Sequence, residues 1–344
     1  MFDKKTVFII GAGAGVEINM PVGTQLSHTI ADKTYIRHKD FGAELQTGDY
    51  AVSNALKRIT KARGLDYNAW RAEACAIREG IFETRSIDAY LNTHKENEAV
   101  KIAGKLAIVQ SILEAEKDCD LFRDNGNWRN NSKVASSWFP ELFYIMQDGV
   151  GRADDIRKIF SSLTFITFNY DRCLEHYLYH TIMGLYRLDE REAAEIMASL
   201  EIFRPYGQVG SLNWEQKGRT KVAFGGSDYR EIEALAEEIK TFNEQIEDQV
   251  ILQHIRGTIN AAERIVFLGF HYHKQNMDLM TVSDIAVAPR PAVIANSFDR
   301  SGPEVSMIEQ RIAKMLGEKR PAKSIEPYSN GCKSLFKHYA ATWM

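Results

Sequence analysis

Short apolar runs that end in turn residues are the clearest pattern along the chain. They are rich in β-branched residues and too short for average helices, which is typical of strands buried on both faces of a parallel sheet. The pattern predicts four core strands, at Thr6–Ile10, Leu163–Phe168, Arg264–Phe270 and Pro291–Asn296. Because helical patterns separate these runs, the sequence predicts an α/β fold built on a Rossmann-like parallel sheet.

The first two predicted strands lie more than 150 positions apart, and the sequence between them has helical periodicity with few strand signals. We therefore predict a large helical insertion between the first and second core strands. Residues 31–158 are assigned to this helical subdomain, and residues 1–30 and 159–344 to the sheet domain. A second apolar stripe, with spacings of three and four, predicts one amphipathic helix over Asp228–Asn260.

Composition narrows the classes of function. With 344 residues and 44% hydrophobic content the chain can bury a full core, and its net charge of −3 gives no general attraction to nucleic acid or anionic membranes. The apolar run at the N-terminus stops at Gly11, which is too short for a signal peptide or a membrane span, so we expect a cytoplasmic protein. Four widely spaced cysteines without a C-x-x-C pair argue against a zinc ribbon and a disulfide framework.

A glycine-rich turn follows the first predicted strand directly and leads into helix-like sequence. Backbone N–H groups in such a turn can approach a diphosphate closely, and a helix N-terminus favours negative charge. Val16 stands where G-x-G-x-x-G has its last glycine, and no strand ending in an acid follows at the usual distance, so an ordinary dehydrogenase is disfavoured. The alternative is a tight structural turn that needs small residues. The turn comprises Gly11, Ala12, Gly13, Ala14 and Gly15.

The second predicted strand ends in polar residues, at Asn169 and Asp171. Ligands of open α/β sheets sit beyond the carboxyl ends of the strands, where these side chains are expected to project. An asparagine there can donate and accept, so it could hold a ribose hydroxyl and position a water. The alternative is a turn that caps the next helix.

Two later segments carry further candidates. Phe203–Trp214 reads as a short strand followed by glycines, and His271 and His273 follow the third predicted strand. Alternate residues face one side of a strand, so the two histidines could share a metal. No third ligand lies near them in the sequence, and we expect no metal site.

Several of these segments, in this order, resemble the sirtuin-like NAD-hydrolysing family of bacterial anti-phage defence proteins. The glycine turn continues through Glu17 and Pro21, where the family's first loop has an acid and a Pro-x-Gly. Ser86–Leu91, which contains Asp88, looks like a helical signature of the family, and Thr167–Asp171 looks like its catalytic asparagine segment.

The resemblance extends to the C-terminal half. Phe267–Phe270, with His273 and Asn276 after it, resembles the family's later NAD-contacting strand. Ala295–Ser301 resembles its adenosine-side strand and the start of the following helix. The match thus covers both ends of the chain, with helical sequence between the pieces.

The resemblance implies a Rossmann-like domain that takes NAD as substrate or ligand, without a metal. It implies catalytic roles for Asn169, Tyr206 and Asp171. The residues it implies for NAD binding are Gly11, Ala12, Gly13, Ala14, Gly15, Glu17, Pro21, Asp88, Thr167, Gly207, Gly269, His273, Asn276, Asn296 and Ser301.

Two departures from related patterns bear on the activity. The chain lacks the two cysteine pairs that hold the structural zinc of sirtuin deacylases, which disfavours deacylation. Where the family has a His-Gly pair, this chain offers Tyr206-Gly207 or Val209-Gly210. Three functions remain open: an anti-phage NAD glycohydrolase, an NAD- or ADP-ribose-binding module that regulates assembly with a partner, and a scaffold with a vestigial cleft. We expect a homo-oligomer or a separate sensor protein as partner.

Overall fold

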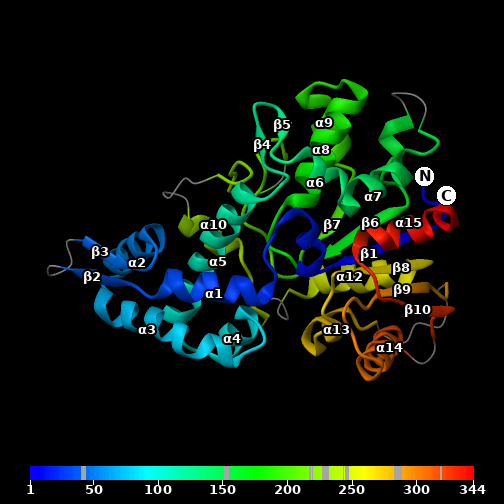
Figure 1. The fold of residues 1–344 in the computed structure, drawn as a ribbon. Helices are drawn as coiled ribbons and strands as arrows, with labels where there is room; N and C mark the ends of the chain where they lie inside the picture. The colour runs from blue at the N-terminus through cyan, green and yellow to red at the C-terminus, as the bar shows by residue number, and fades with distance from the viewer. Residues whose placement is uncertain are drawn as a thin grey trace.

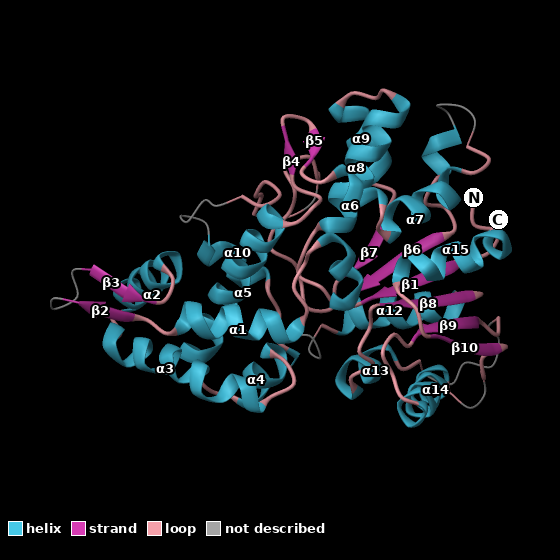
Figure 2. Cartoon of the chain, viewed as in Figure 1, coloured by secondary structure: helices cyan, strands magenta, loops and turns pink. Residues whose placement is uncertain are grey.

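A computed structural model gives the fold of the chain (Figures 1 and 2). It describes residues 1–39, 44–150, 155–216, 218, 220–226, 232–242, 244, 248–282, 289–317 and 320–344. Within this part of the chain, no helix has the length and apolarity needed to cross a membrane.

A six-stranded sheet, parallel throughout, forms the centre of the fold. Its strands are β1 (Thr6–Ile10), β6 (Leu163–Thr167), β7 (Glu201–Phe203), β8 (Arg264–Leu268), β9 (Ala292–Asn296) and β10 (Ser324–Tyr328). The spatial order is β10-β9-β8-β1-β6-β7. When only these strands are numbered along the chain, that is the 3-2-1-4-5-6 order of doubly wound dinucleotide-binding sheets, with the reversal between β1 and β8. The predicted α/β class and Rossmann-like sheet are confirmed.

Helices cover both faces of the sheet, which is why all five residues of β1 are buried. On one face, Phe8 stacks on Phe165 of β6 and Phe336 of α15, at ring-centroid distances of 5.4 and 5.6 Å. On the other face, Val7 and Ile9 belong to the hydrophobic cluster of α12 and α14. The helices named here are α7 (Trp138–Gln147), α12 (Gln249–Ala261), α14 (Gly302–Leu316) and α15 (Cys332–Trp343), of which α7 packs on α15.

The chain between the neighbouring strands β1 and β6 is largely helical. A second hydrophobic cluster is centred on these helices, with α1 and α3 packed around the long helix α5. The helix α10 (Ile232–Glu238), from the chain after β7, packs on α5 as well. Figure 1 shows α2 and α3 far from the chain termini. Besides α7, the α-helices of this stretch are α1 (Gly23–Thr34), α2 (Tyr50–Arg63), α3 (Tyr67–Gly80), α4 (Ile87–Thr93), α5 (Glu98–Asp118) and α6 (Asn131–Ala135). Its hairpins are β2 (Arg37–Lys39) with β3 (Glu44–Thr47) and β4 (Arg123–Asp124) with β5 (Asn127–Trp128).

The prediction of one continuous helix over Asp228–Asn260 is wrong. The described residues form α10 (Ile232–Glu238) and α12, and residues 228–231 lie outside the described part. Between the helices the backbone N–H of Lys240 donates to the Tyr206 carbonyl, at 3.0 Å. Asp248 then begins α12 by accepting the N–H of Ile251, so packing against the Tyr206 turn interrupts the helical pattern.

Candidate nucleotide-binding site

The carboxyl ends of the three central strands are level, because Ile10 pairs in register with Thr167 and with Leu268. The loops that follow these strands therefore meet at one edge of the sheet. In doubly wound folds dinucleotides bind at this edge, where the strand order reverses. Most of the residues that the sequence nominates lie in these loops.

The glycines after β1 bring that loop into backbone contact with the loop after β8. The Gly11 N–H donates to the Leu268 carbonyl and the Gly13 N–H to the Gly269 carbonyl, each at 3.0 Å. A Cβ atom on Gly11 or Gly13 would lie 2.7 or 2.8 Å from the Gly269 oxygen. These two amides are therefore already paired within the protein. The Ala12 N–H, by contrast, donates to no described residue.

Two further glycines are sterically constrained, Gly269 by the same contact and Gly15 by the first loop itself. Gly269 has a φ of +54°, and a Cβ atom there would lie 1.9 Å from the Ala14 nitrogen. A Cβ atom on Gly15 would lie 2.7 Å from the Cβ of Met20. Close packing of the two loops thus accounts for Gly11, Gly13 and Gly269, and packing within the first loop accounts for Gly15. Any diphosphate at this turn would rely on Ala12 rather than on the amides of Gly11 and Gly13.

The rest of the first loop, the 3₁₀ helix η1 (Ala12–Ile18), is tied to the helices around it. The Ala14 carbonyl accepts the indole N–H of Trp138, at 2.8 Å. Glu17 Oε1 accepts the Lys333 N–H in the first turn of α15, at 2.9 Å, and burial raises the pKa of the Glu17 carboxyl. Pro21 lines a cavity of about 560 Å³ between η1, α1 and α5.

At the end of β6, the side chains of Asn169 and Asp171 differ in whether they have a hydrogen-bond partner. Thr167 Oγ1 accepts the N–H of Asn169, at 3.2 Å. The Asn169 side chain is half-buried and forms no hydrogen bond with any described residue. The Asp171 carboxylate accepts the N–H of Cys173, at 3.1 Å, at the start of α8 (Cys173–Tyr186). Asp171 is thus occupied at the helix start, whereas the Asn169 amide is free to bind a ligand.

Two tyrosines link the end of β6 to distant segments. The Tyr206 hydroxyl donates to Asn276 Oδ1, at 2.7 Å, and the Tyr170 hydroxyl donates to Asp88. The two tyrosine rings lie 6.4 Å apart between centroids. Asp88 comes from α4 and Asn276 from α13 (Lys274–Met280), so the structure brings the nominated residues Asp88, Tyr206 and Asn276 together.

The rings of Phe168, Tyr206 and Phe270 form an aromatic cluster at the end of β6. The Phe168 ring lies 5.9 Å from the Tyr206 ring and 5.1 Å from the Phe270 ring. Burial, together with the nearby charge of Asp88, raises the pKa of Tyr206 well above its ordinary value. Tyr206 therefore stays protonated near neutral pH and acts as a hydrogen-bond donor, not as a base.

The remaining nominated residues lie in a turn, at the end of β9 and at the start of a helix. Gly207 has a φ of +75°, and a Cβ atom there would lie 1.9 Å from the Glu238 carbonyl oxygen. The Asn296 amide donates to the Asn330 carbonyl, at 2.7 Å. Ser301 begins α14 in a capping box with Glu304, which accepts its hydroxyl at 2.9 Å.

His273 precedes α13 in a strongly basic surrounding. Burial, and then the neighbouring charges of His271, Arg85, Arg311 and Arg300, lower the pKa of His273 to about 4. The imidazole is therefore neutral near pH 7.

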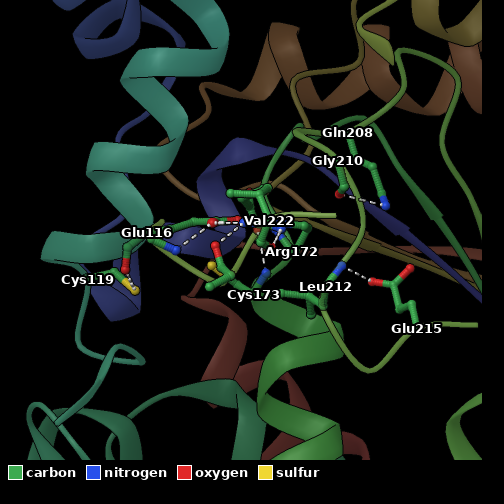
Figure 3. A network of polar contacts seen from close by, with 12 residues as sticks. Glu116, Cys119, Arg172, Cys173, Gln208, Gly210, Leu212, Glu215 and Val222 are labelled. Atoms are coloured by element: carbon green, nitrogen blue, oxygen red, sulfur yellow. Dashed lines mark hydrogen bonds and ion pairs between the residues drawn. The ribbon is translucent and has the colours of Figure 1, made fainter. Parts of the chain in front are cut away.

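Buried arginines that the sequence analysis missed hold the segment around Asn169. Arg204 Nη1 donates to the carbonyls of Asn169 and Asp171, at 3.0 and 2.9 Å, while its Nη2 pairs with Glu175. Arg172, with no exposed side-chain surface, pairs with Glu116 of α5 at 2.5 Å (Figure 3). The sequence signal was a charged residue inside an apolar motif, as in Phe203-Arg204-Pro205.

The same network contains an acid with a shifted pKa. Glu215 accepts the N–H of Leu212 at 2.9 Å (Figure 3). Burial, and then the nearby carboxylate of Glu175, raise the pKa of Glu215 to about 7.

We find no match to this chain among protein-family models or among curated proteins. The resemblance to sirtuin-like proteins therefore rests on the motifs alone. Across the described residues, no three or more histidine, cysteine, aspartate or glutamate side chains are grouped as metal ligands.

Proposed function

We propose that this chain binds NAD at the carboxyl edge of its sheet and hydrolyses the nicotinamide–ribose bond, which releases nicotinamide and ADP-ribose. The observation that carries the proposal is the Asn169 side chain, half-buried at the end of β6 and without a hydrogen-bond partner among the described residues. An asparagine amide can donate to and accept from a ribose hydroxyl and a water. The 3-2-1-4-5-6 strand order supports a dinucleotide at this edge.

The surroundings of Asn169 suit a reaction that depends on orienting the substrate and a water and on stabilising the charge that develops on the ribose. Loss of nicotinamide leaves positive charge on the ribose, so the site must place the ribose and a water and exclude bulk solvent. Arg204 fixes the backbone of Asn169, and the rings of Phe168, Tyr206 and Phe270 provide an apolar wall. With Tyr206 protonated, hydrolysis proceeds without a strong base and is slow.

A second candidate function is supported by a different observation. Two of the three nominated catalytic groups are already occupied within the protein, because the Tyr206 hydroxyl binds Asn276 and the Asp171 carboxylate binds Cys173. A chain with only Asn169 free fits a module that binds NAD or ADP-ribose without chemistry and so regulates assembly. In either case we place it in the cytoplasm, as an anti-phage component acting in a homo-oligomer or with a separate sensor protein.

The test combines calorimetric binding of NAD with chromatographic detection of released nicotinamide. We expect the parent to do both, and Asn169→Ala to lose at least about tenfold in release while its affinity changes far less, because the contact acts mainly in the transition state. Asn127→Ala, at an exposed position of β5, is the matched control. Binding without nicotinamide release would favour the module, and absence of binding would refute both functions.

A further inference from the structure

Basic side chains gather beyond the carboxyl ends of β8 and β9. Arg300 Nη2 lies 2.8 Å from His271 Nδ1, and the His271 and His273 rings lie 5.3 Å apart. Arg311 of α14 donates to the Tyr272 carbonyl in the same loop. The basic cluster is defined here as Arg85, His271, His273, Arg300 and Arg311.

Arg85 comes from the helical insertion. It precedes Ser86, the N-cap residue of α4, and the first turn of that helix carries Asp88. The charge of Arg85 contributes to the lowered pKa of His273. The cluster therefore joins residues of the sheet loops to one of the insertion, next to the Asp88–Tyr170 pair. A ligand bound here would lie at the same edge of the sheet as Asn169.

Acidic side chains only partly balance this charge. Glu304 pairs with Arg300 at 3.2 Å and also accepts the N–H and hydroxyl of Ser301, and Asp299 lies exposed next to Arg300. Asp278 of α13 pairs with Lys274, outside the cluster. The three arginines of the cluster repel one another, and a bound anion relieves that repulsion through charge-assisted hydrogen bonds, to which the neutral histidines can add ring N–H donors.

An exposed aromatic ring lies beside the basic cluster. Phe298 follows β9 and is 61% exposed, which is unusual for a phenylalanine. It lies in a tight turn in which the Arg300 N–H donates to the Ser297 carbonyl at 3.2 Å and Asp299 has a φ of +54°. An aromatic face exposed at the carboxyl end of a strand offers a stacking surface for a base.

We propose that Phe298 stacks on the adenine of the bound dinucleotide, and that Arg300 with His271 binds a phosphate on the adenosine ribose, so that NADP is preferred over NAD. This inference rests on the proposed function. With the nicotinamide half at Asn169 beyond β6, the other half crosses the strand-order reversal toward β8 and β9. An arginine near that ribose is the side chain that accommodates a 2′-phosphate, whereas an acid there accepts from a free hydroxyl. Asp299 is the acid next to Arg300, and if it accepted from the free ribose hydroxyl instead, NAD would be preferred over NADP.

The test is calorimetric titration of the full chain with NADP and, separately, with NAD. We expect the parent to bind NADP at least about tenfold more tightly, as expected for a charge-assisted contact to phosphate. In Arg300→Ala that ratio should fall to about one, whereas Phe298→Ala should weaken both nucleotides and keep the ratio. Arg191→Ala removes the same charge from an 87% exposed side chain on α9 (Glu190–Met197) and should change nothing.

Every other outcome contradicts the NADP preference, the proposed function or the role of Arg300. Equal binding of NADP and NAD by the parent overturns the inference and leaves the proposed function intact. Binding of neither nucleotide overturns both. A preference that survives in Arg300→Ala refutes the assignment of Arg300. If that variant melts well below the parent, the ratio in the parent and in His271→Ala decides instead.

Discussion

Replacing Arg204 by methionine should destabilise the protein strongly, because it breaks an ion pair that is almost fully enclosed. The side chains of Arg204 and Glu175 are only 10% and 8% exposed. Loss of one partner leaves a buried carboxylate without its counter-charge, which costs about 3–5 kcal/mol in buried pairs. Two backbone carbonyls, those of Asn169 and Asp171, also lose their donor.

Urea unfolding followed by circular dichroism measures the effect as a change in the free energy of unfolding. Arg191→Met is the matched control, because it breaks the exposed pair with Glu195, at 87% and 43% exposure, and should cost less than about 1 kcal/mol. Adding Glu175→Gln to Arg204→Met should recover part of the loss, since no charge then remains buried without a partner. A cost below about 1 kcal/mol for Arg204→Met would show that Arg204 does not hold the Asn169 segment.

Two further predictions concern the loop contact and the shifted acid. Gly269→Ala should cost at least about 2 kcal/mol in thermal or urea unfolding, because its Cβ would lie 1.9 Å from the Ala14 nitrogen at a φ of +54°. Gly257→Ala, on α12 with no atom within 4 Å of the added Cβ, should instead stabilise by about 1 kcal/mol, and a loss as large as that of Gly269→Ala would refute the contact argument. Glu215 has a folded pKa of about 7, above its unfolded value of 4.5, so its contribution is fully present below pH 4.5 and is lost as pH rises through about 7. Relative to Glu215→Gln, the parent should lose about 3 kcal/mol of unfolding free energy between pH 4.5 and 7.5, and parallel profiles would contradict the burial of this acid.

The core strands were predictable because their apolar runs are continuous. β7 and β10 carry weaker signals, since β7 has only three residues and the edge strand β10 contains Glu326 and Pro327. An edge strand faces solvent on one side and tolerates proline, so its sequence lacks the buried-strand pattern. The break in the helix after Glu238 coincides with a contact between Lys240 and Tyr206, which periodicity alone does not reveal.

The sequence predicted residues of the candidate site only where a single continuous segment is enough to place them. Asn169 follows its strand directly, and position alone places it at the carboxyl edge. The Arg172–Glu116 pair joins residues 56 positions apart, and no local sequence spacing predicts such a partner. The glycines of the first loop and the segment after β8 were both visible in the sequence, but the contact between them, which requires Gly11 and Gly13, was not.

A crystal structure of the chain with ADP-ribose tests the central claim most directly. It should show the ligand at the carboxyl edge of the sheet, with a ribose hydroxyl within hydrogen-bond distance of the Asn169 side chain and the diphosphate near Ala12. Ligand bound elsewhere, such as in the cavity of about 560 Å³ lined by Pro21, with the Asn169 amide free of contacts, would contradict the proposed site.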